Sequence, residues 1–122
     1  MTRALFEITK TARFEAAHSL ADGPPAYAKV HGHSFRVEAT LAGPAEGPMG
    51  WVEDLAALEA ALSAAADELD HSLLNEHPGL ETPTLEALCV WFAGRLQAQF
   101  PRLKRIVVSR PSVGETCAME IV

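Results

Sequence analysis

Residues 29–41 read KVHGHSFRVEATL, and from residue 31 onward the side chains alternate between two classes. One parity carries polar side chains, whereas the other is apolar and contains Phe35, Val37, Ala39 and Leu41. Successive side chains of a β-strand point to opposite faces of its sheet, so this alternation predicts a strand with one face on a core. His31 and His33 belong to the apolar parity, and both imidazoles are therefore expected on that face.

A second segment, residues 5–18, alternates in the same way and is predicted to pair with the first as a hairpin. Its apolar parity holds Phe6, Ile8, Ala12, Phe14 and Ala16, and His18 continues it. Lys10 is the exception in this series, which predicts a bulge in the strand near Lys10.

The hydrophobic period then changes from two to that of a helix. A helix is predicted over residues 55–69 with Asp54 as its N-cap, and a second over residues 85–99 with Thr84 as its N-cap. Residues 105–109 and 118–122 are predicted to be short strands. The order ββααββ predicts an α+β fold, with both helices on one face of a four-stranded antiparallel sheet.

Composition limits the classes of function. The chain has 122 residues, which predicts a single domain over residues 1–122. Its net charge of −6 argues against a nucleic-acid or membrane-surface binder, although a local basic pocket for an anionic small molecule is compatible with it. The N-terminal residues lack a signal-peptide core, and no apolar run has the length of a membrane span, so a cytoplasmic location is expected.

The two cysteines show no disulfide framework and no zinc-ribbon spacing. Cys89 lies beside apolar residues in a predicted helix, and a buried, inert thiol is expected there. Cys117 lies in a polar segment, and the sequence leaves its state open.

Three of the five histidines share the apolar parity of the two predicted strands: His18, His31 and His33. Three neutral imidazoles on one face of a sheet, with a fourth position open, form a typical catalytic zinc arrangement. The alternative is one or two structural histidines, hydrogen-bonded near the edge of a sheet. Parity alone does not decide between the two.

Asp70 and His71 follow the first predicted helix. An aspartate beside a histidine can orient the ring or stabilise its protonated form, which suits general acid–base catalysis. Adjacent residues rarely point the same way, so the functional contact is expected with a neighbouring segment or another subunit. A purely structural alternative is that a cationic His71 is favoured at a helix C-terminus.

Taken together, these segments resemble the 6-pyruvoyl-tetrahydropterin synthase and 6-carboxytetrahydropterin synthase family. The resemblance runs in family order through almost the whole chain and is carried by FEAAH (14–18), HGHSF (31–35), GWVEDL (50–55), LDHSLLN (69–75), PGLETPTLEAL (78–88) and ETC (115–117). HGH alone is not specific, whereas the set of motifs is.

The resemblance implies the T-fold, whose sheets form a barrel in trimers that usually stack into hexamers. It also implies a zinc ion held by His18, His31 and His33. The implied substrate is dihydroneopterin triphosphate, which loses its triphosphate in the reaction. The 6-carboxytetrahydropterin synthase branch of the family serves queuosine biosynthesis. The implied acid–base pair is Asp70 and His71. Residues Thr84 and Glu86 match the stretch that lines the pterin pocket, and Lys29 is expected beside the substrate.

The sequence departs from the family at two positions. The first is Tyr27, which stands where the family has a catalytic cysteine, four residues before HGH. A tyrosine ordinarily titrates near pH ~10 and is a poor base at neutral pH, so Tyr27 is expected to act as a proton donor or to leave the reaction weak or altered. Some family members use a glutamate nearby, but residues 26–30 contain none. Cys117 is a further candidate thiol.

The second departure concerns the glutamate that binds the N–H donors of the pterin, just after the third long strand. A gapless alignment puts Arg110 there, and an alignment with a short insertion puts Glu115 there. A guanidinium offers only donors, so Glu115 is expected to bind the pterin, and Arg110 to meet a phosphate or another carboxylate.

The sequence therefore predicts a zinc-dependent pterin enzyme that forms a homo-oligomer. Three alternatives remain: side-chain cleavage of dihydroneopterin in the same pocket, a pterin- or purine-binding relative without the family reaction, and a T-fold scaffold with a structural metal.

Overall fold

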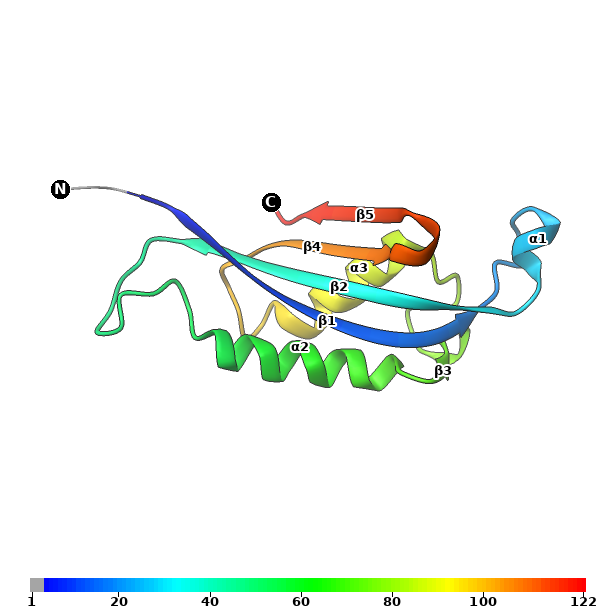
Figure 1. Cartoon of the computed structure of the whole chain (residues 1–122), viewed down its shortest axis with the longest axis horizontal. Helices are drawn as coiled ribbons and strands as arrows, with labels where there is room; N and C mark the ends of the chain where they lie inside the picture. The colour runs from blue at the N-terminus through cyan, green and yellow to red at the C-terminus, as the bar shows by residue number, and fades with distance from the viewer. Residues whose placement is uncertain (1–3) are drawn as a thin grey trace.

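The computed structural model describes residues 4–122 (Figure 1). Its elements follow in chain order: β1 (Phe6–His18), α1 (Pro25–Ala28), β2 (His31–Gly43), α2 (Leu55–Leu69), β3 (Ser72–Leu73), η1 (Leu74–Glu76), α3 (Leu85–Leu96), β4 (Leu103–Arg110), η2 (Pro111–Val113) and β5 (Glu115–Glu120). The α+β class and the order of the six long elements are confirmed.

One sheet contains all the described strands in the order β3-β1-β2-β4-β5. The four long strands are antiparallel neighbours, whereas β3 pairs in parallel with Ala16 and Ala17 of β1. The predicted four-stranded sheet is therefore wrong by one short strand. A two-residue strand has no periodicity that a sequence pattern could reveal, which explains the difference.

The helices α2 and α3 both cover one face of the sheet (Figure 1). Their apolar stripes and the apolar parity of the strands form a single core, whose largest buried side chains include Phe14, Phe35, Phe92, Leu58 and Leu62. Both predicted N-caps are confirmed, because Asp54 accepts a hydrogen bond from Ala56 N and Thr84 accepts one from Ala87 N. The α3 helix ends at Leu96 rather than residue 99.

The bulge expected near Lys10 is wrong. The pairing of β1 with β2 runs without a shift from Phe6 to His18. The register shift lies instead between β2 and β4, where Thr40 pairs with Arg105 and Leu41 pairs with Leu103. Lys10 keeps its place on the helix-facing side because its ammonium extends to Glu59 of α2, at 3.6 Å. A long side chain with a charged end thereby fits an otherwise apolar series.

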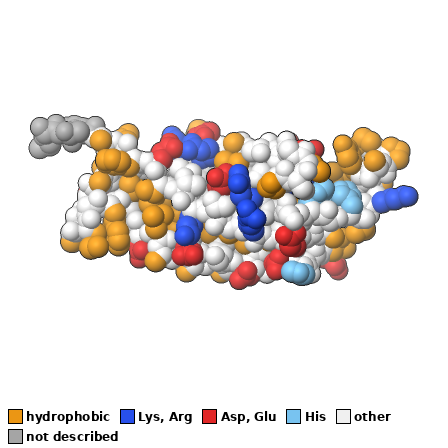
Figure 2. Space-filling model, in the orientation of Figure 1, with side chains coloured by type: hydrophobic (Ala, Val, Ile, Leu, Met, Phe, Trp, Pro, Cys, Tyr) orange, Lys and Arg blue, Asp and Glu red, His pale blue; other side chains and the backbone are white. Residues whose placement is uncertain are grey.

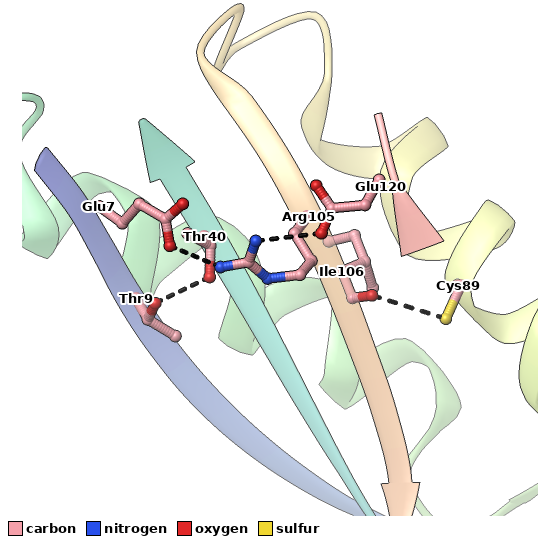
Figure 3. A network of polar contacts seen from close by, with 7 residues as sticks. All are labelled: Glu7, Thr9, Thr40, Cys89, Arg105, Ile106 and Glu120. Carbon is pink, nitrogen blue, oxygen red and sulfur yellow. Dashed lines mark hydrogen bonds and ion pairs between the residues drawn. The ribbon is translucent and has the colours of Figure 1, made fainter. Parts of the chain in front are cut away.

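The opposite face of the sheet is polar (Figure 3). Arg105 of β4 donates hydrogen bonds to Glu7 of β1 at 2.6 Å and to Glu120 of β5 at 3.0 Å, and both bonds raise the pKa of Arg105. Thr9 and Thr40 share a hydrogen bond of 2.7 Å on the same face. The described helices leave this face uncovered, and its polar groups bind one another across the strands.

The last strand begins earlier than predicted, at Glu115 rather than residue 118. A 3-10 turn and Gly114, with a φ of 69°, reverse the chain after β4, so that Arg110 pairs directly with Glu115. Such a positive φ favours glycine. Within residues 4–122, no helix is long and apolar enough to cross a membrane.

Candidate metal centre and active site

Three histidines meet at the end of the sheet where β1 ends and β2 begins. His18 and His31 are register partners, and His33 lies two residues further along the same face of β2. The ring centroids are separated by 4.6 Å for His18–His31, 5.1 Å for His18–His33 and 4.9 Å for His31–His33. One nitrogen from each ring lies within 4.8 Å of the other two. Strand parity and hairpin register thus bring together the three imidazoles that the sequence predicts.

Backbone carbonyls orient two of the rings. His18 Nδ1 lies 3.0 Å from the Pro83 carbonyl oxygen, and His31 Nδ1 lies 2.8 Å from the Lys29 carbonyl oxygen. Each Nδ1 must carry its proton to donate to a carbonyl, which leaves Nε2 as the free lone pair. This pattern, with one ring nitrogen held by a backbone oxygen, is typical of histidines that bind a metal.

The free nitrogens fit a metal. The Nε2 atoms of His18 and His33 are buried and have no hydrogen-bond partner among the described residues. Burial lowers the pKa of His18, and it lowers the pKa of His33 to about 4, with the charge of Arg110 as the next cause. Both rings are therefore neutral at pH 7, the form that binds a metal. Three neutral imidazoles with an open fourth position suit a divalent transition metal such as zinc.

A pocket of about 330 Å³ opens beside the histidines and is lined by Leu20, Ala26, Tyr27, His31, His33, Arg110, Val113 and Glu115. Figure 2 shows histidine side chains at the surface of this end of the molecule, next to α1. Arg110 and Glu115 therefore both line the pocket, although the two alignments treated these residues as alternatives. Arg110 Nε lies 2.9 Å from Glu115 Oε1. The register of the β4–β5 hairpin creates this pair.

One wall of the pocket is the segment between β1 and β2, which carries Tyr27. It closes on itself, since Leu20 N donates to the Tyr27 carbonyl at 2.7 Å. Asn75 fixes its beginning: its Oδ1 accepts from Ser19 N at 3.0 Å, while its Nδ2 donates to the carbonyls of Ser19 at 2.9 Å and Glu81 at 3.3 Å. Asn75 lies in the LDHSLLN motif, and its structural role was not predicted. The signal available in the sequence was a polar amide, able both to donate and to accept hydrogen bonds, directly after two leucines.

Asp70 and His71 lie at the edge of the sheet, against the backbone of β1. Asp70 Oδ1 accepts from Glu15 N at 2.8 Å, and His71 N donates to the Glu15 carbonyl at 2.6 Å. The Glu15 side chain, which points away from the helices, accepts a bond of 2.6 Å from Ser34. Within one chain, His71 and His33 both line an open pocket along this edge, whereas Asp70 and His71 do not line the smaller pocket beside the histidines.

Asp70 and His71 do contact each other, contrary to the expectation for adjacent residues. His71 Nδ1 lies 2.8 Å from Asp70 Oδ2, because a φ of 57° at His71 turns its ring back toward the carboxylate. The Glu15 N–H bond and the His71 contact lower the pKa of Asp70. Asp70 is therefore a carboxylate at neutral pH and can orient the ring of His71.

The remaining predicted residues lie outside the histidine pocket of this chain. Thr84 caps α3 and lines a separate pocket with Ser19 and Asn75, Glu86 is exposed in the first turn of α3, and the Lys29 side chain is exposed. Cys117 packs against the core, with its carbonyl 3.5 Å from the buried Cys89 Sγ. The expected burial of Cys89 is confirmed, and this burial raises the pKa of the thiol to about 12.

Comparison with known proteins agrees with this geometry. The family model for 6-pyruvoyl tetrahydropterin synthase matches residues 7–120. A 6-carboxy-5,6,7,8-tetrahydropterin synthase from Synechocystis is 36% identical over 116 residues, which cover 90% of this chain and 86% of the relative.

Two solved structures share the fold. The 6-pyruvoyl tetrahydropterin synthase of Caenorhabditis elegans superposes with a TM-score of 0.83 at 22% identity, covering 100% of both chains. That of Plasmodium vivax gives a TM-score of 0.70 at 17% identity, covering 98% of this chain and 100% of the other. The family match over nearly the full length and the histidine cluster lead to one conclusion: this chain belongs to the 6-pyruvoyl tetrahydropterin synthase family of enzymes.

Proposed function

We propose that this chain is a single-domain, zinc-dependent pterin enzyme, which converts 7,8-dihydroneopterin triphosphate to a 6-carboxy- or 6-pyruvoyl-tetrahydropterin. The observation that carries the proposal is the cluster of His18, His31 and His33 beside a pocket, in which the buried Nε2 atoms of His18 and His33 have no hydrogen-bond partner among the described residues. The Synechocystis relative, named for the 6-carboxy product, favours that branch.

The three histidines are the proposed zinc ligands. When bound, the metal supplies a Lewis acid that polarises an oxygen of the substrate side chain. The Pro83 and Lys29 carbonyls keep the rings of His18 and His31 in the tautomer that offers Nε2.

Proton transfer is assigned to Asp70 and His71. The carboxylate accepts from Glu15 N and faces His71 Nδ1, so the imidazole has one nitrogen held and Nε2 free to exchange a proton with substrate. Tyr27 lines the histidine pocket where the family has a cysteine, and its hydroxyl is the proposed proton donor on the second side of the substrate.

A homo-oligomer would bring the two halves of the site together. Within residues 4–122, the outer edge of β1 is paired only at Ala16 and Ala17, and β5 is the other edge of the sheet. Unpaired edges favour pairing with further copies, and closure into a barrel removes them. We propose a trimer, or a hexamer of two trimers, in which Asp70 and His71 of one subunit act at the histidine pocket of the next.

Glu115 is the proposed acceptor for the ring N–H donors of the pterin. Its side chain lines the pocket and is 48% exposed, so its second oxygen is accessible to a ligand. Thr84, Glu86 and Lys29 are proposed to contact substrate in a pocket completed by a neighbouring subunit.

The direct test is product identification. Purified protein of known zinc content is incubated with 7,8-dihydroneopterin triphosphate, and the products are identified by mass. The proposal predicts free triphosphate together with either a 6-pyruvoyl-tetrahydropterin, which keeps all three side-chain carbons, or a 6-carboxy-tetrahydropterin, in which case the other two carbons leave as a two-carbon aldehyde. A hydroxymethyl-dihydropterin would show side-chain cleavage instead, and unchanged substrate would exclude the reaction.

The shared site is tested by mixing two inactive variants, His71→Ala and the double variant His31→Ala/His33→Ala. If each site takes its histidines from one subunit and Asp70–His71 from the next, random reassembly of equal amounts restores activity at about a quarter of the sites. Activity that stays at background after reassembly would place the whole site within one subunit.

A further inference from the structure

Arg110 is a charged side chain in the histidine pocket, and the proposed reaction gives it no role. Its side chain is only 15% exposed, whereas that of its partner Glu115 is 48% exposed. It lines the pocket together with His31 and His33. The guanidinium therefore lies deeper than the Glu115 carboxylate and close to the proposed metal ligands.

The hydrogen-bonding capacity of Arg110 is not used up by Glu115. The carboxylate oxygen is 2.9 Å from Nε but lies off the N–H direction, so that the buried Nε–H has no hydrogen-bond acceptor among the described residues. A guanidinium has five N–H donors in a planar fork, and leaving a buried donor without an acceptor is costly. An acceptor supplied by a ligand would remove that cost.

The charges around Arg110 indicate what kind of acceptor fits. Among the described residues that line the pocket, Glu115 alone is acidic, and its charge is balanced by Arg110. Any metal on the three histidines adds further positive charge. A ligand oxygen that lies between the metal and the guanidinium is therefore stabilised most when it carries negative charge, and a carboxylate or phosphate also matches the fork geometry.

We propose that Arg110 binds an anionic oxygen group, either a carboxylate or a phosphate, of the ligand in the histidine pocket. This assignment rests on the proposed pterin function for the identity of the ring. It makes Arg110 a specificity-determining residue, which favours ligands with an anionic group over neutral ligands with the same ring.

The test measures binding of three probes to the zinc-loaded protein. 6-Carboxypterin and 6-hydroxymethylpterin share the ring and differ in charge, and both are followed by fluorescence. Inorganic phosphate is followed by phosphorus NMR. The variants are Arg110→Met and Arg110→Lys, and the control is Arg95→Met, because Arg95 also pairs with a carboxylate (Glu68, 2.9 Å) but lies outside the pocket. Circular dichroism confirms that each variant is folded.

If the ligand group is a carboxylate, Arg110→Met weakens 6-carboxypterin binding about tenfold to a hundredfold, because a charge-assisted hydrogen bond is lost. The affinity for 6-hydroxymethylpterin stays within about twofold of the wild-type value. With a phosphate as the group, the loss appears for inorganic phosphate alone. Arg110→Lys, which keeps the charge and remains an alternative if the methionine variant misfolds, shows a smaller loss. Arg95→Met changes none of the three affinities.

Three results would overturn the proposal. The first is an unchanged affinity for both anionic probes in the Arg110 variants, and the second is an equal loss for both pterins. The third is full recovery of anion binding in Arg110→Met/Glu115→Gln, which would mean that Arg110 only neutralises Glu115. If neither pterin binds to the wild type while phosphate binding still requires Arg110, the pterin assignment fails and the anion site stands.

Discussion

Replacing Asn75 with alanine should weaken both the fold and the metal site. Asn75 forms two hydrogen bonds of 3.0 Å and 2.9 Å with Ser19, which follows the proposed ligand His18, and a longer bond of 3.3 Å to the Glu81 carbonyl. The loop between η1 and α3 contains both Glu81 and Pro83, and the Pro83 carbonyl holds His18 Nδ1. The amide thus links the end of β1 to the loop that orients its histidine.

The size of the effect follows from these contacts. Each of the two shorter bonds contributes about 1 kcal/mol, and the long bond adds less, so Asn75→Ala should lower the free energy of unfolding by about 2 kcal/mol. For a chain of this length the Tm should fall by roughly 8 °C at fixed protein concentration. Loss of a group that supports a metal ligand typically costs tenfold to a hundredfold in metal affinity, and a loss of about tenfold is expected for zinc.

The assay combines thermal unfolding with competition for zinc against a chelator. Asn75→Asp keeps the acceptor for Ser19 N, but in place of the two donated bonds it puts a carboxylate oxygen against the carbonyl oxygens of Ser19 and Glu81. Because these oxygens repel one another, the Tm of Asn75→Asp should lie at or below that of the alanine variant. Glu76→Ala is the matched control, because Glu76 is an exposed neighbour in η1. If Asn75→Ala unfolds and binds zinc like Glu76→Ala, the proposed link between the loop and His18 does not exist.

Three further predictions concern single side chains. Thr84→Ala should cost about 1 kcal/mol of stability through the lost α3 cap, while Thr84→Ser should be nearly neutral; equal stability of the two in chemical denaturation would contradict this. With its pKa raised to about 12, the Cys89 thiol is ~10⁻⁴ ionised at pH 8, so iodoacetamide should modify it only after unfolding, as peptide mass analysis would show; rapid native labelling would be inconsistent with its burial. Tyr27→Cys should raise turnover by up to ~10²–10⁴, whereas Tyr27→Phe should lower it; an unchanged rate in both would mean that neither hydroxyl nor thiol is needed.

Strand parity was sufficient to predict which three histidines share one face of the sheet. The alternation of residues 5–18 and 31–41 fixes which side chains share a face, and hairpin register then brings His18 opposite His31. The helix caps at Asp54 and Thr84 were predictable for a similar reason, since each requires only a side-chain oxygen that accepts a hydrogen bond from the first turn of its helix. Features set by period or by adjacent residues were therefore predictable.

Features set by long-range geometry were not. Whether Arg110 or Glu115 reaches the pocket depends on the turn at Gly114, which makes them cross-strand partners, and no alignment of the segment alone would show that. The contact between Asp70 and His71 requires a positive φ at a histidine, which a propensity argument disfavours. The role of Asn75 depends on two loops that are far apart in the sequence.

The zinc content of the wild type and of the double variant His31→Ala/His33→Ala tests the central claim most directly. Both proteins are purified without metal-affinity steps and analysed for metals, with Glu76→Ala as a surface control. The account predicts close to one zinc per chain in the wild type and in Glu76→Ala, and almost none in the double variant. Full zinc retention by the double variant would show that the three histidines are not the metal site.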